Sequence, residues 1–139
     1  MKYGKVWGVQ CMESKKTIGK VQVVDTFYTL YLWKDFQALQ DFANERNSRY
    51  LHKNDGDPID GYCDVLSKEI HVFTDEYTHP DYFDTTLRHE IAHAYLYEVA
   101  YAHYDDEELI DKIAKWTPKI MGIFELGKGM IEDARTKKE

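Results

Sequence analysis

The chain has 139 residues, of which 31% are charged and 43% hydrophobic, and its formal net charge at pH 7 is -7. This length predicts a single domain, residues 1–139, that can bury a core without disulfide bonds. The acidic balance excludes a general nucleic-acid binder, which needs a basic surface for phosphates. No apolar run approaches the roughly 20 residues that span a bilayer, so we expect no membrane segment. With only Cys11 and Cys63 and no apolar signal segment, a cytoplasmic location is expected.

The first third of the chain is predicted to be mainly extended. Valine and aromatic residues are frequent in residues 2–12 and again in residues 18–33, which is typical of β-strands. Residues 13–20 are expected to form the turn between these strands. Apolar residues then recur at helical spacing over residues 34–47, which predicts the first helix.

The middle of the chain is predicted to contain a loop, two short strands and a central helix. Residues 52–61 (HKNDGDPIDG) contain two glycines and a proline, which interrupt regular structure. Residues 62–76 are predicted to form two short strands, the second of them over residues 69–74 (EIHVFT). An apolar stripe then predicts a helix from Thr86 to Tyr101, with candidate N-cap residues at positions 84, 85 and 86.

A last helix is predicted to begin at Asp105 or Asp106, because carboxylates suit the N-terminus of a helix. Its apolar stripe continues beyond Pro118, where we expect a kink or a break. Strands in the first half and helices in the second predict the α+β class. The expected architecture is a small mixed or antiparallel sheet packed on helices.

Two histidines lie four residues apart in the predicted central helix, within the stretch TLRHEIAHAYLYE. Residues four apart share one helix face, so His89 and His93 can present imidazole nitrogens to one tetrahedral zinc ion. Glu90 flanks that position, where a carboxylate can take a proton from a water that the metal activates. The HExxH pattern therefore predicts a hydrolytic zinc site, with His89 and His93 as ligands and Glu90 as general base.

The next helix offers a third ligand, which a catalytic zinc needs beside its open position. Glu107 and Asp111 are four residues apart and therefore lie on one face. We predict Glu107 as the ligand and Asp111 as the acceptor of an N–H from a liganding histidine. Glu108 stays open as an alternative ligand, since helix starts shift by a residue or two.

Each of these observations also has an explanation without zinc. Two histidines on a half-polar helix face can be ordinary hydrogen-bonded histidines, and acids can simply cap a helix. His52, His71 and His79, which lie beside a loop, within a strand and before a proline, are expected to be exposed or satisfied rather than ligands. The HExxH pattern followed by an acidic helix start is harder to explain by packing and capping, and it favours zinc.

The stretches LRHEIAHAYLYE and EELIDKIAKWTPKI resemble small zinc metallopeptidases of prophages and integrative elements. These belong to the gluzincin group and are related to the ImmA/IrrE-type metallopeptidases. The resemblance covers Tyr62–Ile120 and implies a zincin-like domain, in which a sheet packs on the HExxH helix and a glutamate-bearing helix follows. It implies the same histidine ligands and general base, with Glu107 and Asp111 matching the gluzincin Glu-x-x-x-Asp pattern. These residues depart from the Glu-Ala-Asn motif of the ImmA-like branch.

The resemblance also implies how a substrate binds. The strand before the motif helix, residues 69–74, is expected to be a sheet edge that pairs with an extended peptide. A proton donor near the end of the motif helix is expected to stabilise the oxyanion. The candidates for that donor are Tyr97, Tyr101, His103 and Tyr104.

The predicted function is therefore a zinc-dependent peptidase whose substrate is a protein or peptide, for which a repressor of a phage or mobile element is the implied example. The alternative is a non-catalytic binding protein that keeps the zincin fold with a structural or vestigial zinc. A third hypothesis is that no metal binds and the histidines are structural. Glu90→Gln separates the first two, because only hydrolysis needs the general base.

Overall fold

The computed structural model describes residues 14–49 and 58–138. The described elements, in chain order, are β1 (Lys15–Val23), β2 (Thr26–Trp33), α2 (Phe36–Arg49), β3 (Gly61–Asp64), β4 (Glu69–Phe73), α3 (Pro80–Glu98) and α4 (Glu107–Lys138). The four strands form one small mixed sheet, so the predicted α+β class is confirmed. Within these residue ranges, no helix has both the length and the apolar character needed to cross a membrane.

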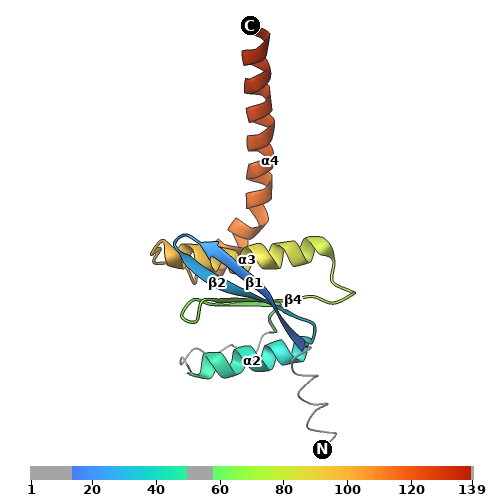
Figure 1. Cartoon of the computed structure of the whole chain (residues 1–139), viewed down its shortest axis with the longest axis vertical. Helices are drawn as coiled ribbons and strands as arrows, with labels where there is room; N and C mark the ends of the chain where they lie inside the picture. Colours follow the sequence, from blue (N-terminus) through green and yellow to red (C-terminus); the bar gives the residue numbers. More distant parts are fainter. Residues whose placement is uncertain (1–13, 50–57, 139) are drawn as a thin grey trace, which may run out of the picture.

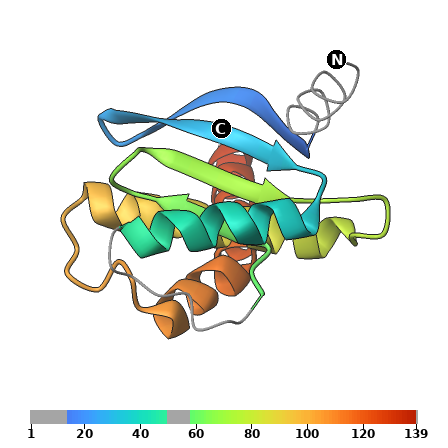
Figure 2. The same ribbon diagram turned by 90° about the horizontal axis from the view of Figure 1, so that it is seen from below.

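The sheet lies between two helices. Its strand order is β1-β2-β4-β3, with β2 and β4 parallel and the two outer pairs antiparallel. Helix α3 covers one face and α2 covers the other (Figures 1 and 2). Strand β4 is therefore an interior strand, and the expectation that residues 69–74 form a sheet edge is wrong. The edge strand on that side of the sheet, which also contacts α3, is β3.

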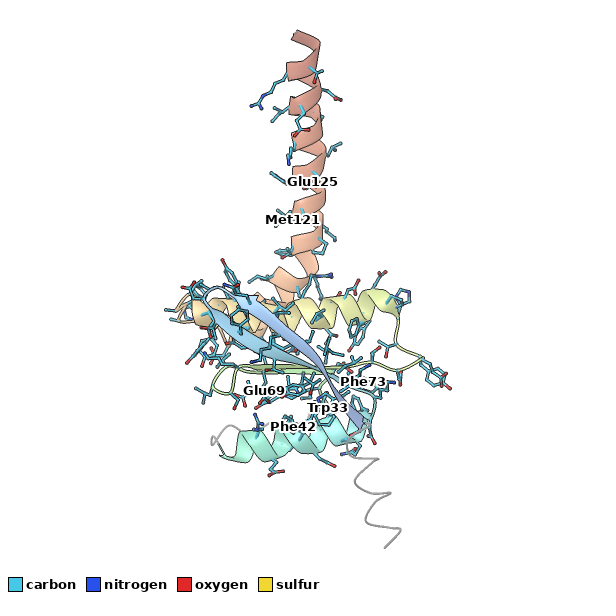
Figure 3. All side chains as sticks on the ribbon, viewed as in Figure 1. Trp33, Phe42, Glu69, Phe73, Met121 and Glu125 are labelled. Carbon is cyan, nitrogen blue, oxygen red and sulfur yellow. The ribbon has the colours of Figure 1, made fainter. Side chains whose placement is uncertain are left out.

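The side chains of β4 are buried on both faces of the sheet. Ile70 and Val72 are buried in the apolar core on the α3 side, together with Tyr28 and Ala94. His71 is fully buried on the opposite face, toward α2. Figure 3 shows the aromatic layer between the sheet and α2, where Trp33, Phe42 and Phe73 lie. A strand that is covered on both faces needs apolar or fully bonded residues throughout, and this segment has them.

The first strands differ from the sequence prediction. Residues 15–20 belong to β1, so the turn expected over residues 13–20 is wrong, and the strand predicted over residues 2–12 lies outside the described residues. The chain instead reverses after Val23, where Val24 has a φ of 58°. A β-branched residue rarely adopts this conformation, and neither glycine nor proline marks the turn in the sequence.

Helix α3 begins six residues before the predicted start at Thr86. The N-cap is His79, whose Nδ1 accepts a hydrogen bond from the backbone N–H of Asp81 at 3.1 Å. Pro80 occupies the first helical position, where its missing N–H costs nothing. The hydroxyls of Thr85 and Thr86 donate to backbone carbonyls one turn earlier, so they lie within the helix rather than capping it.

Helix α4 begins within one residue of its predicted start and does not break at Pro118. The side chain of Asp106 accepts a first-turn backbone N–H at 3.2 Å. Because proline has no N–H, the carbonyl of Ala114 loses its helical partner. The Nε of Arg88 on α3 donates to that carbonyl at 2.8 Å, so the helix continues through the proline with this carbonyl satisfied. Its C-terminal part projects away from the sheet (Figure 1).

Candidate metal centre

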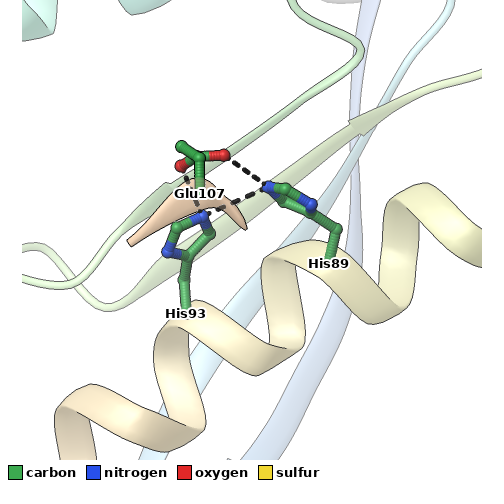
Figure 4. Close-up of side chains that lie close together, drawn as sticks. All are labelled: His89, His93 and Glu107. Carbon is green, nitrogen blue, oxygen red and sulfur yellow. Dashed lines mark hydrogen bonds and ion pairs between the residues drawn. The ribbon is translucent and has the colours of Figure 1, made fainter. Parts of the chain in front are cut away.

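Three side chains from two helices meet at one point. His89 and His93 are one turn apart on α3, and Glu107 opens α4 (Figure 4). The Nε2 atoms of both histidines lie 2.9 Å from different oxygens of the Glu107 carboxylate, and 3.2 Å from each other. One potential ligand atom from each residue lies within 4.8 Å of the others. Two imidazole nitrogens and a carboxylate oxygen at this separation can surround one metal ion.

The other ring nitrogen of each histidine is also bonded. The Nδ1 atom of His89 lies 2.9 Å from a carboxylate oxygen of Asp111, and the Nδ1 atom of His93 lies 2.7 Å from the backbone carbonyl of Tyr104. Both acceptors require a proton on Nδ1, so when either ring is neutral its lone pair is on Nε2, the atom that faces Glu107. Partners of this kind fix the orientation and the tautomer of metal-binding histidines.

Glu90 lies on the side of α3 that faces the sheet. It is 6% exposed, and a Cβ placed on Gly61 of β3 would lie only 2.7 Å from its Oε2. The backbone of the edge strand therefore passes directly over this carboxylate, and a larger residue at position 61 would displace the Glu90 side chain. Burial raises the pKa of Glu90 to about 7, although the neighbouring charges of His89 and His93 lower it. At neutral pH this carboxyl can thus both accept and release a proton.

The cluster also shifts the pKa values of its own members. Burial lowers the pKa of His89, but its hydrogen bond to Glu107 and the charges of Glu90 and Asp111 outweigh burial and raise it to about 8. The pKa of His93 is raised in the same way, against burial, first by its hydrogen bond to Glu107. The hydrogen bonds from the two histidines hold the pKa of Glu107 well below its usual range. Glu107 therefore stays ionised, and its negative charge favours a cation at this point.

The two candidate third ligands lie differently. Glu107 faces both histidines, whereas the side chain of Glu108 is 82% exposed and forms an ion pair with Lys112 at 3.3 Å. Because α4 starts at Glu107, the two glutamates are rotated by about 100° from each other around the helix. Of the two glutamates, only Glu107 contacts the histidines, and Asp111, one turn later, contacts the far side of His89.

The four candidate proton donors follow the HExxH motif, at the end of α3 and in the loop after it. Tyr97 packs edge to face on Tyr104, with ring centroids 4.9 Å apart, and Tyr101 packs on His103 at 5.6 Å. The backbone carbonyl of Tyr104 accepts a hydrogen bond from His93. Sequence reasoning missed this contact because a backbone carbonyl leaves no residue-type signal. Gly61 was also missed, since it was treated only as a loop breaker.

The remaining candidate ligands are engaged elsewhere or lie outside the described residues. His71 is enclosed by aromatic rings beneath the sheet, and His79 caps α3. Cys63 is a half-buried free thiol whose pKa is raised by burial. Cys11 and His52 lie outside the described residues. Comparisons of the chain with models of protein families, with curated proteins and with solved structures found no match.

Proposed function

We propose that this chain is a zinc-dependent peptidase of the zincin type, with His89, His93 and Glu107 as metal ligands and Glu90 as general base. The observation that carries the proposal is the convergence of two Nε2 atoms on one carboxylate, 2.9 Å away on each side. The helical spacing of the histidines, the acid after the first of them and the glutamate of a following helix together match the gluzincin pattern.

The donor set fits zinc. Imidazole nitrogens and a carboxylate oxygen are preferred zinc ligands, and three protein ligands leave one coordination position open. The Nδ1 partners, Asp111 and the Tyr104 carbonyl, supply the outer hydrogen bonds that such histidines need. Two histidines and one carboxylate also suit Fe²⁺, which an elemental measurement distinguishes.

Glu90 supplies the proton transfer. When bound, zinc would act as a Lewis acid on the scissile carbonyl and on water. Glu90 takes a proton from the attacking water and delivers it to the departing amine, which requires a pKa near the working pH. Its burial beneath β3 raises its pKa to about 7, which meets that requirement. The neighbouring Gly61 leaves room for the carboxylate.

The substrate we propose is an extended peptide that pairs with the outer edge of β3, on which no other strand lies in the described part of the chain. This strand is the outer member of the sheet, and its first residue, Gly61, touches the carboxylate of Glu90. An added strand would form hydrogen bonds with backbone N–H and C=O groups of that edge. A peptide bound there would pass next to the general base. A regulatory protein of a phage or mobile element is the substrate class that the resemblance implies.

The first test is the metal content of the purified protein by elemental mass spectrometry. We expect close to one zinc per chain in the wild type and in Glu108→Ala, and loss of zinc in Glu107→Ala. Because the two variants remove the same charge from neighbouring positions, a loss of zinc in Glu107→Ala alone identifies Glu107 as a ligand. Absence of zinc in the wild type, after zinc has been supplied and the excess removed, would contradict the proposal.

The second test asks whether the zinc is catalytic. A mixture of random peptides is incubated with the wild type and with Glu90→Gln, and new peptide ends are identified by mass spectrometry. We expect cleavage by the wild type and a loss of about 100- to 10,000-fold in the variant, with its zinc retained. If zinc is bound and cleavage is equal in both proteins, Glu90 is not the base. If neither cleaves, a binding protein with structural zinc is the better account.

A further inference from the structure

The C-terminal part of α4 has no covering layer in the described part of the chain. Ala114 is its last buried residue, and from Lys115 to Thr136 every residue is exposed except Gly127, which is half-buried. Met121 and Glu125 stand on this projecting part, far from the sheet (Figure 3). Helices in proteins gain most of their stability from packing an apolar face, and this part of α4 packs on nothing in the described residues.

This projecting part nevertheless carries a continuous apolar surface. Its large apolar side chains are between 48% and 73% exposed: Trp116, Ile120, Met121, Ile123, Phe124, Leu126, Met130 and Ile131. One line of residues advances by alternating steps of four and three, as in the core of a coiled coil. We call this line the seam; it consists of Trp116, Ile120, Ile123, Gly127, Met130 and Ala134.

The seam is large enough for a stable interface. Every large apolar residue in the group except Met121 lies on the seam or directly beside it. At roughly 100 Å² each, these side chains offer about 700 Å² per copy, close to the about 800 Å² that each partner buries in a standard interface. The seam also runs into an open apolar groove at the base of α4, which is lined by Ile113 and Thr117 of α4 and by Ile91 and Tyr95 of α3.

We propose that a second copy of this chain covers the seam, with the two α4 helices antiparallel. Placing Ile123 opposite Gly127 of the second copy also places Trp116 opposite Ala134 and Ile120 opposite Met130, so Trp116, the bulkiest residue of the seam, meets a small one. The same alignment brings Lys119 beside Asp133 of the second copy, and it does so twice because the pair is symmetric. A parallel pair would stack Trp116 on itself, leave two glycines facing each other and place Lys119 beside Phe124.

The test measures the mass of the full-length protein by sedimentation equilibrium at concentrations up to about 100 µM. We expect a dimer for the wild type. Lys119→Asp and Asp133→Lys should each raise the dimer dissociation constant about tenfold, because each creates two like-charge contacts. The double variant should recover the wild-type constant. The matched control is Lys128→Asp, an equal charge change away from the seam, which should have little effect.

Mixing the two single variants gives a second, independent measurement. In the antiparallel pair, a heterodimer of Lys119→Asp with Asp133→Lys restores both opposite-charge contacts, so the mixture should dimerise more tightly than either variant alone. Circular dichroism of each variant checks that it is folded. A wild type that stays monomeric would assign the seam to a different partner protein and overturn the proposal. A dimer in which the two reversals do not compensate would overturn it as well.

Discussion

The molecule holds two histidine environments that differ in almost every physical respect. His71 lies between the sheet and α2, fully buried among aromatic rings, with Tyr31 stacked on it at a centroid distance of 4.7 Å. Its Nδ1 accepts a hydrogen bond from the indole N–H of Trp33 at 2.9 Å, and its Nε2 lies 2.9 Å from Glu69. Both nitrogens of the neutral ring are therefore used, and none is left for a metal.

His89 and His93 lie on the other side of the sheet and have the opposite arrangement. Each ring uses only Nδ1 for an outer partner, and both Nε2 atoms converge on Glu107. The pKa of His71 falls to about 4, chiefly because of burial, whereas the carboxylates around His89 raise its pKa to about 8 despite burial. A histidine becomes a candidate ligand through the number of carboxylates around it and the direction of its free nitrogen, rather than through burial.

The largest expected difference comes from removing one ring from each environment. We expect His93→Ala to lower zinc affinity by at least about 1,000-fold, because a ligand is lost. We expect His71→Ala to keep zinc but to lower the free energy of unfolding by about 2–4 kcal/mol, because it leaves a cavity and an unpaired Trp33 indole N–H. Zinc titration and denaturant unfolding measure the two effects. Loss of zinc from folded His71→Ala would remove the distinction between the environments.

The second difference concerns the carboxylate that accepts a hydrogen bond from each ring, Asp111 for His89 and Glu69 for His71. Asp111→Asn should weaken zinc binding by about 10- to 100-fold, because the amide is a poorer acceptor for the Nδ1–H of His89. The matched change in the other environment, Glu69→Gln, should leave zinc affinity unchanged. Competition with a chelator of known affinity measures both. Equal zinc affinities in the two variants would show that Asp111 does not orient His89.

The third difference is the response of the metal-free protein to pH. The folded-state pKa of His71, about 4, is below its ordinary 6.5, so its unfolded form binds the proton first and stability falls as the pH drops from 6.5 toward 4. The folded-state pKa of His89, about 8, is above 6.5, so its contribution is present below 6.5 and is lost as the pH rises through 8. These shifts correspond to about 3 and about 2 kcal/mol, respectively.

Thermal unfolding across this pH range, with a chelator present, measures both the loss of stability at acid pH (the acid limb) and the loss at alkaline pH (the alkaline limb). We expect His71→Phe to flatten the acid limb and Glu107→Gln to flatten the alkaline limb, since the glutamine removes the carboxylate that raises the pKa of His89. The pKa of Glu90 is raised from 4.5 to about 7, so Glu90 also contributes stability that is lost as the pH rises, but at a lower pH than for His89. Added zinc should stabilise more at pH 8 than at pH 6, because zinc binds the neutral rings. An alkaline limb that is unchanged in Glu107→Gln would contradict the assignment.

The contrast between these histidines also shows how far the sequence could lead. The spacing of His89 and His93 on one helix face, and of Glu107 and Asp111 on the next, is a local property of a helix, and the structure brings these four residues together. The choice between Glu107 and Glu108 depended on the helix start, where an error of one residue rotates the side chain by about 100°.

Contacts between distant segments could not be predicted in this way. The interior position of β4 follows from strand order, which pairs it with both β2 and β3 and is not encoded in its own residues. The approach of Gly61 to Glu90 depends on where β3 lies on α3. The sequence predicted a kink or a break at Pro118. Helix α4 does not break there, and the residue that satisfies the free carbonyl of Ala114 is Arg88, on another helix.

The smallest expected effect tests whether that contact helps to hold the candidate metal centre. Arg88→Met keeps much of the side-chain volume but removes the donor to Ala114, so we expect the free energy of unfolding to fall by about 1–3 kcal/mol. Because α4 carries Glu107, zinc affinity should fall too. We expect a fall of less than about tenfold, which is smaller than the fall expected for Asp111→Asn, because Arg88 does not contact a ligand directly. The NMR signals of the His71 ring, on the far side of the sheet, should stay in place. Lys115→Met, at an exposed position of α4, is the matched control. If Arg88→Met is as stable as this control, the contact from α3 does not help α4 to pass through Pro118, and it does not help to hold Glu107 at the candidate metal centre.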